Sequence, residues 1–110
     1  MSDVLTRLTE VLNQRKQADA AESYVASLYE AGLNKILEKV GEEATETILA
    51  AKDCQDEAGR KAVVYETGDL IFHTLVMLAH LDIPADEVLA ELERRMGTSG
   101  LEEKASRGQA

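Results

Sequence analysis

The sequence predicts an all-α fold, in the form of a bundle of four to five helices. Aromatic residues make up 4% of the 110 residues and tryptophan is absent, so the core must be packed from Leu, Val, Ile and Ala, as in helical bundles. Apolar residues recur at helical spacing, and the alternation typical of a strand is nearly missing. By its length the chain is one domain. We expect residues 1–97 to form an all-α domain and residues 98–110 to form a flexible polar tail.

The first half of the chain contains three predicted helices. Residues 3–16 carry Val and Leu at helical spacing and form the first helix. A second short helix lies within residues 17–32 and ends at Gly32, a residue type that favours helix ends. A third helix follows over residues 35–52. The stripe that would bury it against a core consists of Leu33, Ile36, Leu37, Val40, Ala44, Ile48 and Ala51.

Two further helices are predicted in the second half. Asp, Gln and Gly interrupt the pattern within KDCQDEAGRK, residues 52–61, and a long helix then runs over about residues 56–81. Pro84 ends it, since proline cannot continue a helix. The last helix covers residues 84–96, with acidic residues early and arginines late, as the helix dipole favours.

Charge and composition argue against some classes of function. The formal net charge of −9 and the lack of a Lys/Arg cluster argue against nucleic-acid binding. The N-terminus lacks a basic region followed by an apolar run, and the single cysteine cannot form an intrachain disulfide. The longest apolar run, residues 70–81, has twelve residues, well short of the ~20 that span a bilayer. We therefore expect a cytoplasmic protein that binds neither nucleic acid nor membrane.

Three glutamates gather on the third helix. At about 100° per residue, Glu42, Glu43 and Glu46 fall on one face, and Lys35 and Lys39 project onto the same arc. A charged face opposite an apolar stripe is usually just the solvent-exposed side of a helix. The third helix alone therefore does not establish a site.

A second carboxylate pair lies on the long fourth helix. Glu66 and Asp69 are three residues apart and so neighbours on the helix surface, whereas the residues that follow are apolar on nearly every face. We expect this helix to be buried all round. A carboxylate in a buried site must be paired or bound to metal, because an uncompensated charge there costs several kcal/mol. Either Lys and Arg side chains neutralise these two residues or a metal cation binds them.

The two carboxylate groups converge if the third and fourth helices pack antiparallel through the short connection at residues 53–57. The result is a pocket of four or five carboxylates without Cys or His, which suits a hard divalent cation, and Mg²⁺ in particular. Lys35 and Lys39 would then meet the oxygens of a phosphorylated substrate. Because the protein is acidic, such a substrate needs cations between itself and the protein.

The motif E-E-x-x-E, nineteen intervening residues and E-x-x-D resembles the signature of the all-α nucleoside triphosphate pyrophosphohydrolases, the MazG-like superfamily. One branch, the phosphoribosyl-ATP pyrophosphohydrolases, is resembled more closely by SYVASLYEAGLNKILEKVGEEATETILAAK, YETGDLIFHTLVML and LERRMGTSGLEEKASR. The resemblance implies Mg²⁺-dependent hydrolysis of phosphoribosyl-ATP to phosphoribosyl-AMP and pyrophosphate, the second step of L-histidine biosynthesis, in a helical homodimer. It also implies Glu43, Glu46, Glu66 and Asp69 as metal ligands, with Glu42 as a further ligand or the general base.

Further residues are candidates for substrate contacts. Ser23 and Tyr24 lie in the family-like segment and would line the nucleotide site, with packing as the alternative role of Tyr24. Lys104 and Arg107 in the tail would hold a distal phosphate of the substrate, unless the tail is only a charged disordered segment. His73 lies one turn beyond the aspartate and could orient it, although a histidine in an apolar helix is more often a core or interface residue.

Two alternatives to this enzyme stay open. A housecleaning pyrophosphohydrolase of the same superfamily would act on dUTP or other nucleotides, and it leaves the SGLEEKASR segment unexplained. A non-catalytic helical dimerisation module would pair Glu66 and Asp69 with protein cations and bind no Mg²⁺. A homodimer is expected because the apolar segment of residues 70–79 exceeds what a 110-residue monomer covers.

Overall fold

The computed structural model describes residues 2–97, so the predicted substrate contacts Lys104 and Arg107 lie outside the described residues. Within residues 2–97, five α-helices and one 3₁₀ helix follow one another without a strand. They are α1 (Ser2–Gln14), η1 (Arg15–Gln17), α2 (Tyr24–Ala31), α3 (Leu33–Lys52), α4 (Glu57–His80) and α5 (Ala85–Met96). The predicted all-α fold is confirmed.

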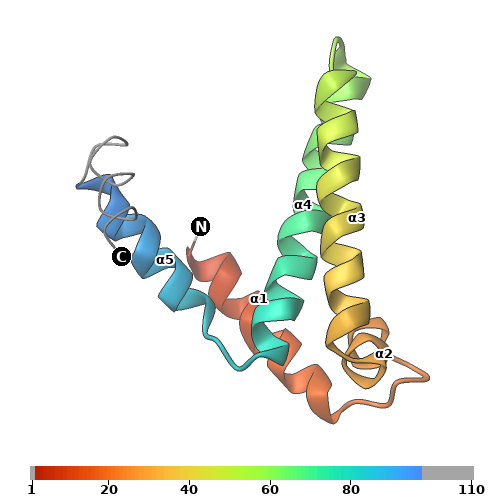
Figure 1. Cartoon of the computed structure of the whole chain (residues 1–110), viewed down its shortest axis with the longest axis vertical. Coiled ribbons are helices and arrows are strands. Elements are labelled where there is room, and N and C mark those ends of the chain that lie inside the picture. Colours follow the sequence, from red (N-terminus) through yellow and green to blue (C-terminus); the bar gives the residue numbers. More distant parts are fainter. Residues whose placement is uncertain (1, 98–110) are drawn as a thin grey trace.

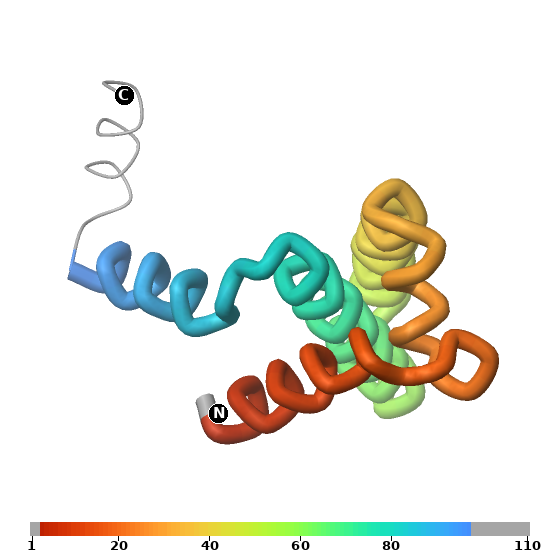
Figure 2. Tube along the Cα trace, turned by 90° about the horizontal axis from the view of Figure 1, so that it is seen from below, coloured from red at the N-terminus to blue at the C-terminus, as the bar shows by residue number. Residues whose placement is uncertain are grey.

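The helices form an open V (Figure 1). One arm is a long antiparallel hairpin in which α3 and α4 run side by side, and the other arm contains α1 and α5. α2 lies at the base of the hairpin and contacts α3. Figure 2 shows α1 and α5 extending away from the hairpin on the same side. Only the base of the V therefore brings most of the helices together.

The core lies at this base. Its buried members are leucine, valine, isoleucine and alanine, as the composition predicted, and Tyr29, Phe72 and Met77 pack against them partly buried. The buried residues are Leu12, Val25, Leu28, Ile36, Leu75, Val76, Ala79 and Ala85. The upper part of the hairpin is thus held mainly by the contact between α3 and α4.

Local contacts set the helix boundaries around the hairpin. Ser23 Oγ accepts a hydrogen bond from Ala26 N at 3.1 Å and caps α2. Asp56 Oδ1 accepts one from Gly59 N at 2.8 Å and caps α4. Gly32 stands between α2 and α3 with a φ of +100°, a backbone conformation that favours glycine. The chain therefore passes from α2 into α3 without a longer loop.

The second helix starts later than its predicted range. The prediction placed it within residues 17–32, whereas α2 begins at Tyr24. Asp19 holds the preceding segment in a turn, because its Oδ1 accepts from Ala21 N and its carbonyl oxygen accepts from Ser23 N. The short polar side chain thus competes with helix formation at this point.

The prediction that the fourth helix is buried all round is wrong for the single chain. Val64, Tyr65 and Ile71 of α4 are 72%, 71% and 47% exposed. The reason is that only α3 runs along the N-terminal half of α4, while α1 and α5 lie near its other end. An apolar helix with one neighbour leaves its remaining faces open.

The predicted orientation of the third helix is wrong in part. Ile36 is buried as expected, but Ile48, also assigned to the buried stripe, is 60% exposed. Glu43, assigned to the charged face, is only 4% exposed and lies between α3 and α4. The line of buried and half-buried residues follows Ile36, Val40, Glu43 and Thr47, at spacings of four, three and four. The seam with α4 is therefore rotated away from the centre of the apolar stripe.

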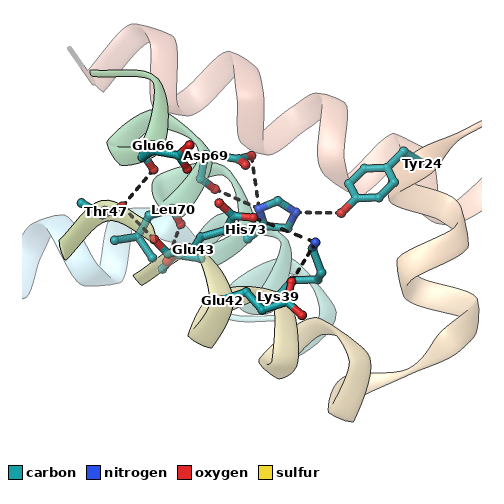
Figure 3. Close-up of polar contacts among 10 residues, drawn as sticks. Tyr24, Lys39, Glu42, Glu43, Thr47, Glu66, Asp69, Leu70 and His73 are labelled. Atoms are coloured by element: carbon teal, nitrogen blue, oxygen red, sulfur yellow. Dashed lines mark hydrogen bonds and ion pairs between the residues drawn. The ribbon is translucent and has the colours of Figure 1, made fainter. Parts of the chain in front are cut away.

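By length and composition alone, α4 could cross a membrane. Core helices of soluble proteins meet the same criterion, so a single such helix is weak support for a membrane protein. In addition, α4 carries carboxylates that face α3 (Figure 3). The predicted absence of a membrane partner stays a prediction.

Candidate active site

Carboxylates of α3 and α4 meet across the hairpin. Glu43, Glu46 and Glu66 each place a carboxylate oxygen within 4.8 Å of the others. Glu43 and Asp69 form a second such group with a ring nitrogen of His73. Glu43 belongs to both groups, and Figure 3 shows it on α3 opposite Glu66 and Asp69 on α4. We call Glu43, Glu46, Glu66 and Asp69 the carboxylate cluster; the structure brings together all four predicted metal ligands.

The convergence follows from the hairpin. Glu43 and Asp69 each lie thirteen residues from Asp56, and Glu46 and Glu66 each lie ten residues from it. Asp56 is the cap at the start of α4, next to the turn. In two antiparallel helices of equal rise per residue, positions equally distant from the turn lie at the same height. Each α3 carboxylate therefore meets its α4 counterpart.

Burial leaves the cluster poorly compensated. Within residues 2–97, neither Glu43 Oε2 nor Glu66 Oε2 has a hydrogen-bond partner, although both atoms are buried. Burial, followed by the nearby Asp69 and Glu46, raises the pKa of Glu43 to about 7. Burial, followed by Glu46, also raises the pKa of Glu66. Full ionisation of the cluster is unfavourable unless a cation joins the carboxylates.

The described residues offer Glu66 and Asp69 no lysine or arginine partner. Asp69 Oδ1 lies 3.4 Å from His73 Nδ1, and Lys39 Nζ lies 3.9 Å from Glu43 Oε1. A dimerisation module was expected to neutralise Glu66 and Asp69 with protein cations, and none is found within residues 2–97. Buried carboxylate oxygens without hydrogen-bond partners, with no thiolate among them, fit a hard divalent cation such as Mg²⁺.

Lys39 and Glu42 lie at the rim of the cluster. Lys39 Nζ is 3.1 Å from Glu42 Oε2, and this hydrogen bond holds the pKa of Glu42 below its ordinary value. Glu42 belongs to neither group of converging ligand atoms, so it stands beside the cluster. Lys35 lies one turn farther from the cluster and pairs with Glu38 at 3.6 Å. Of the two predicted lysines, Lys39 is therefore the one next to the carboxylates.

Ser23 and Tyr24 lie beside α4 at the start of α2. Ser23 caps the helix through its hydroxyl, and Tyr24 OH lies 2.9 Å from His73 Nε2. Both residues border an open pocket of about 440 Å³. Its other polar or aromatic lining residues are Arg15, Asp19, Glu22 and Phe72. Tyr24 thus borders this pocket and contacts His73 beside the carboxylate cluster.

Sequence reasoning did not find Thr47. Its hydroxyl lies 2.7 Å from the carbonyl oxygen of Glu43 and 3.1 Å from that of Glu66, so it bridges α3 and α4 beside the cluster (Figure 3). The one sequence feature that points to Thr47 is its position four residues after Glu43. Because threonines inside helices commonly bond the carbonyl four residues earlier, that spacing alone does not indicate a site.

A family model described as phosphoribosyl-ATP pyrophosphohydrolase matches residues 5–96. The match spans α1 to α5 and includes the whole carboxylate cluster, Lys39 and Tyr24. It confirms the resemblance drawn from the glutamate motifs and their surrounding segments. It ends before the SGLEEKASR segment, which also lies outside the described residues.

Proposed function

Because the chain belongs to the phosphoribosyl-ATP pyrophosphohydrolase family, a family of hydrolases that act on an anhydride bond, we propose that it performs the Mg²⁺-dependent step of L-histidine biosynthesis that this family carries out. The substrate is phosphoribosyl-ATP, and the products are phosphoribosyl-AMP and pyrophosphate. The observation that carries the Mg²⁺ dependence is the pair of buried oxygens, Glu43 Oε2 and Glu66 Oε2, without a hydrogen-bond partner in the described part of the chain.

The carboxylate cluster would hold Mg²⁺ in this proposal. Its four side chains supply oxygen donors from both helices of the hairpin, and Mg²⁺ is usually bound by a few carboxylates while substrate phosphates and waters complete its shell. When bound, Mg²⁺ supplies positive charge against the phosphate oxygens. The same charge compensates the burial and the nearby Asp69 and Glu46, which together raise the pKa of Glu43.

The remaining residues of the site have roles in binding and proton transfer. Lys39, at the rim of the cluster, meets a phosphate oxygen as a point charge. A water attacks phosphorus, the anhydride bond between the α and β phosphates breaks, and pyrophosphate leaves. The proton of the water passes to the clustered carboxylates, which titrate as a set. Glu42 is a poorer base, since its hydrogen bond with Lys39 lowers its pKa.

We also propose that the protein is a homodimer. The radius of gyration is 16.4 Å, whereas a compact domain of this length has about 13 Å. Large apolar side chains on the α3–α4 hairpin are exposed, among them Ile48, Leu49, Val64, Tyr65 and Ile71. A second copy that packs on this hairpin would bury them. Light scattering should give the mass of two chains at micromolar concentration, and a stable monomer would contradict the proposal.

Two further expectations belong to this function. A biosynthetic enzyme of this kind is expected in the cytoplasm. Lys104 and Arg107 are expected to contact the distal phosphate of the substrate. Truncation after Gly97 should then raise KM for phosphoribosyl-ATP while the melting temperature stays unchanged, because a remote phosphate contact contributes binding energy without building the core. An unchanged KM would exclude this role for the tail.

Pyrophosphate release from a panel of nucleotides tests the proposed activity. Purified protein is given phosphoribosyl-ATP, ATP, dUTP or dCTP with Mg²⁺, and we expect efficient turnover of phosphoribosyl-ATP alone. Glu66→Gln and Asp69→Asn should abolish that turnover without loss of helix content. Glu57→Gln, at an exposed position of the same helix, is the matched control and should keep full activity. Efficient turnover of dUTP or dCTP without phosphoribosyl-ATP would favour the housecleaning alternative.

A further inference from the structure

His73 is held on both sides beside the carboxylate cluster. The residue lies on α4, is 3% exposed, and comes one helical turn after Asp69. Its Nε2 lies 2.9 Å from the hydroxyl of Tyr24 on α2, and its Nδ1 lies 2.9 Å from the carbonyl oxygen of Asp69. Nδ1 is also 3.4 Å from Asp69 Oδ1. Figure 3 shows the imidazole standing between Tyr24 and Asp69.

The hydrogen-bond partners determine the role of each ring nitrogen. A carbonyl oxygen only accepts, so Nδ1 must carry the proton that Asp69 O accepts. In the neutral ring Nε2 then has the free lone pair, and the hydroxyl of Tyr24 donates to it. Both nitrogens of His73 are therefore engaged. The ring lies within reach of a metal held by Glu43 and Asp69, but it has no lone pair left to serve as a ligand.

Tyr24 is not placed there by burial. The residue is 53% exposed, so its ring contributes little to the core. Its backbone is nevertheless fixed, because Ser23 caps α2 directly before it and the hydroxyl of Ser27 donates to the Tyr24 carbonyl oxygen. The first turn of α2 thus holds the hydroxyl of Tyr24 in line with His73.

We propose that Tyr24 and His73 are positioning residues, which tie α2 to α4 and hold Asp69 against Glu43 in the geometry that binds the divalent cation. Hydrogen-bonded partners of metal ligands restrict the orientation of those ligands and strengthen metal binding. Here His73 Nδ1 donates to the carbonyl oxygen of Asp69 and lies 3.4 Å from its carboxylate, and Tyr24 restrains the ring of His73 from a different helix. This inference rests on the proposed metal site.

A second Tyr–His pair between the same two helices provides a matched control. Tyr29 of α2 stacks on His80 of α4 with ring centroids 5.9 Å apart, the same separation as for Tyr24 and His73. The hydroxyl of Tyr29 donates to the carbonyl oxygen of Leu12 at 2.9 Å. Tyr29→Phe therefore removes a hydrogen bond as long as the one between Tyr24 and His73, and from the same helix. The bond that it removes connects α2 to α1 and does not involve α4.

Metal binding without substrate tests the proposal directly. Mn²⁺ is titrated into the full-length, metal-free protein, and the unbound ion is measured by electron paramagnetic resonance. Loss of a residue that hydrogen-bonds a metal ligand typically weakens metal binding about 10- to 100-fold. We expect Tyr24→Phe to weaken Mn²⁺ binding about 3- to 10-fold, because Tyr24 acts on Asp69 only through His73. Tyr29→Phe should bind Mn²⁺ as the wild type does. Equal affinities of Tyr24→Phe and the wild type would overturn the proposal.

Variants of His73 and the dependence of activity on Mg²⁺ complete the test. His73→Leu should weaken Mn²⁺ binding by about tenfold or more, and His73→Gln should restore part of the affinity because its amide can both donate and accept. Tyr24→Phe should need a higher Mg²⁺ concentration than the wild type for half-maximal turnover, which a general loss of stability would not produce. If the wild type itself binds no Mn²⁺, the proposed metal site fails and this inference fails with it. Normal wild-type binding with an unaffected Tyr24→Phe refutes the positioning role alone.

Discussion

Replacing Glu43 by glutamine should stabilise the metal-free protein while abolishing its activity. Glu43 is buried among Asp69, Glu46 and Glu66, and its pKa is raised to about 7. Above pH 7 the folded protein must therefore hold an unfavourable negative charge when no cation is bound. The amide of glutamine has the same shape and no charge, and it can donate a hydrogen bond to Asp69.

The magnitude follows from the pKa of Glu43. A rise from the ordinary value of 4.5 to about 7 in the folded state corresponds to a destabilisation of at most about 3 kcal/mol above pH 7. Burial is the largest cause of this rise, followed by Asp69 and Glu46, and because Glu46 is exposed, solvent screens part of its repulsion of Glu43. We therefore expect Glu43→Gln to raise the unfolding free energy at pH 8 by about 1–2 kcal/mol. At pH 5 the folded carboxyl of Glu43 keeps its proton, and the difference between the two proteins should be much smaller than at pH 8.

Urea unfolding in EDTA at pH 5 and pH 8, at one protein concentration, measures this difference. The adjacent Glu42→Gln is the control with the opposite sign, because the hydrogen bond with Lys39 lowers the pKa of Glu42 and its removal should slightly destabilise the protein. Addition of Mg²⁺ should stabilise the wild type and leave Glu43→Gln unaffected. A Glu43→Gln variant that is less stable at pH 8, or that Mg²⁺ stabilises as strongly as the wild type, would refute the reasoning.

Three further predictions concern the pH dependence, the core and the rim of the site. The stability of the metal-free wild type should fall as pH rises from about 4.5 to about 7, because folded Glu43 keeps a proton that the unfolded chain releases. Thermal melts without and with Mg²⁺ should show this fall only in the absence of the ion. Ile36→Ala, at a fully buried position, should lower the unfolding free energy by about 2–5 kcal/mol, whereas Ile48→Ala, at an exposed position, should mainly raise the dissociation constant of the dimer in sedimentation experiments. Lys39→Gln should lower kcat/KM by about tenfold or more through loss of a charged contact, and steady-state kinetics of Lys35→Gln should match the wild type, because Lys35 lies one turn farther away.

The number and order of the α-helices followed from the sequence alone, although α2 starts later than predicted. Helical spacing of apolar residues and a short polar connection predicted that the two carboxylate groups converge if the helices pack antiparallel. Glu43 and Asp69 lie equally far along the chain from the cap of α4, which places them at the same height in the hairpin. This succeeded because helix rise and turn position are local properties that neighbouring residues decide. The restriction to oxygen ligands likewise follows from residue type alone.

The face that each helix turns toward the core depends on packing against the other helices. The apolar stripe of α3 is broad, so several rotations would bury a similar area, and packing against α4 selected the one that buries Glu43 and exposes Ile48. The hydrogen bond between Tyr24 and His73 joins residues 49 positions apart in the sequence. It depends on how α2 lies against the hairpin. Periodicity along a single helix holds no information on such a contact, because the relative placement of two helices depends on the side chains of both.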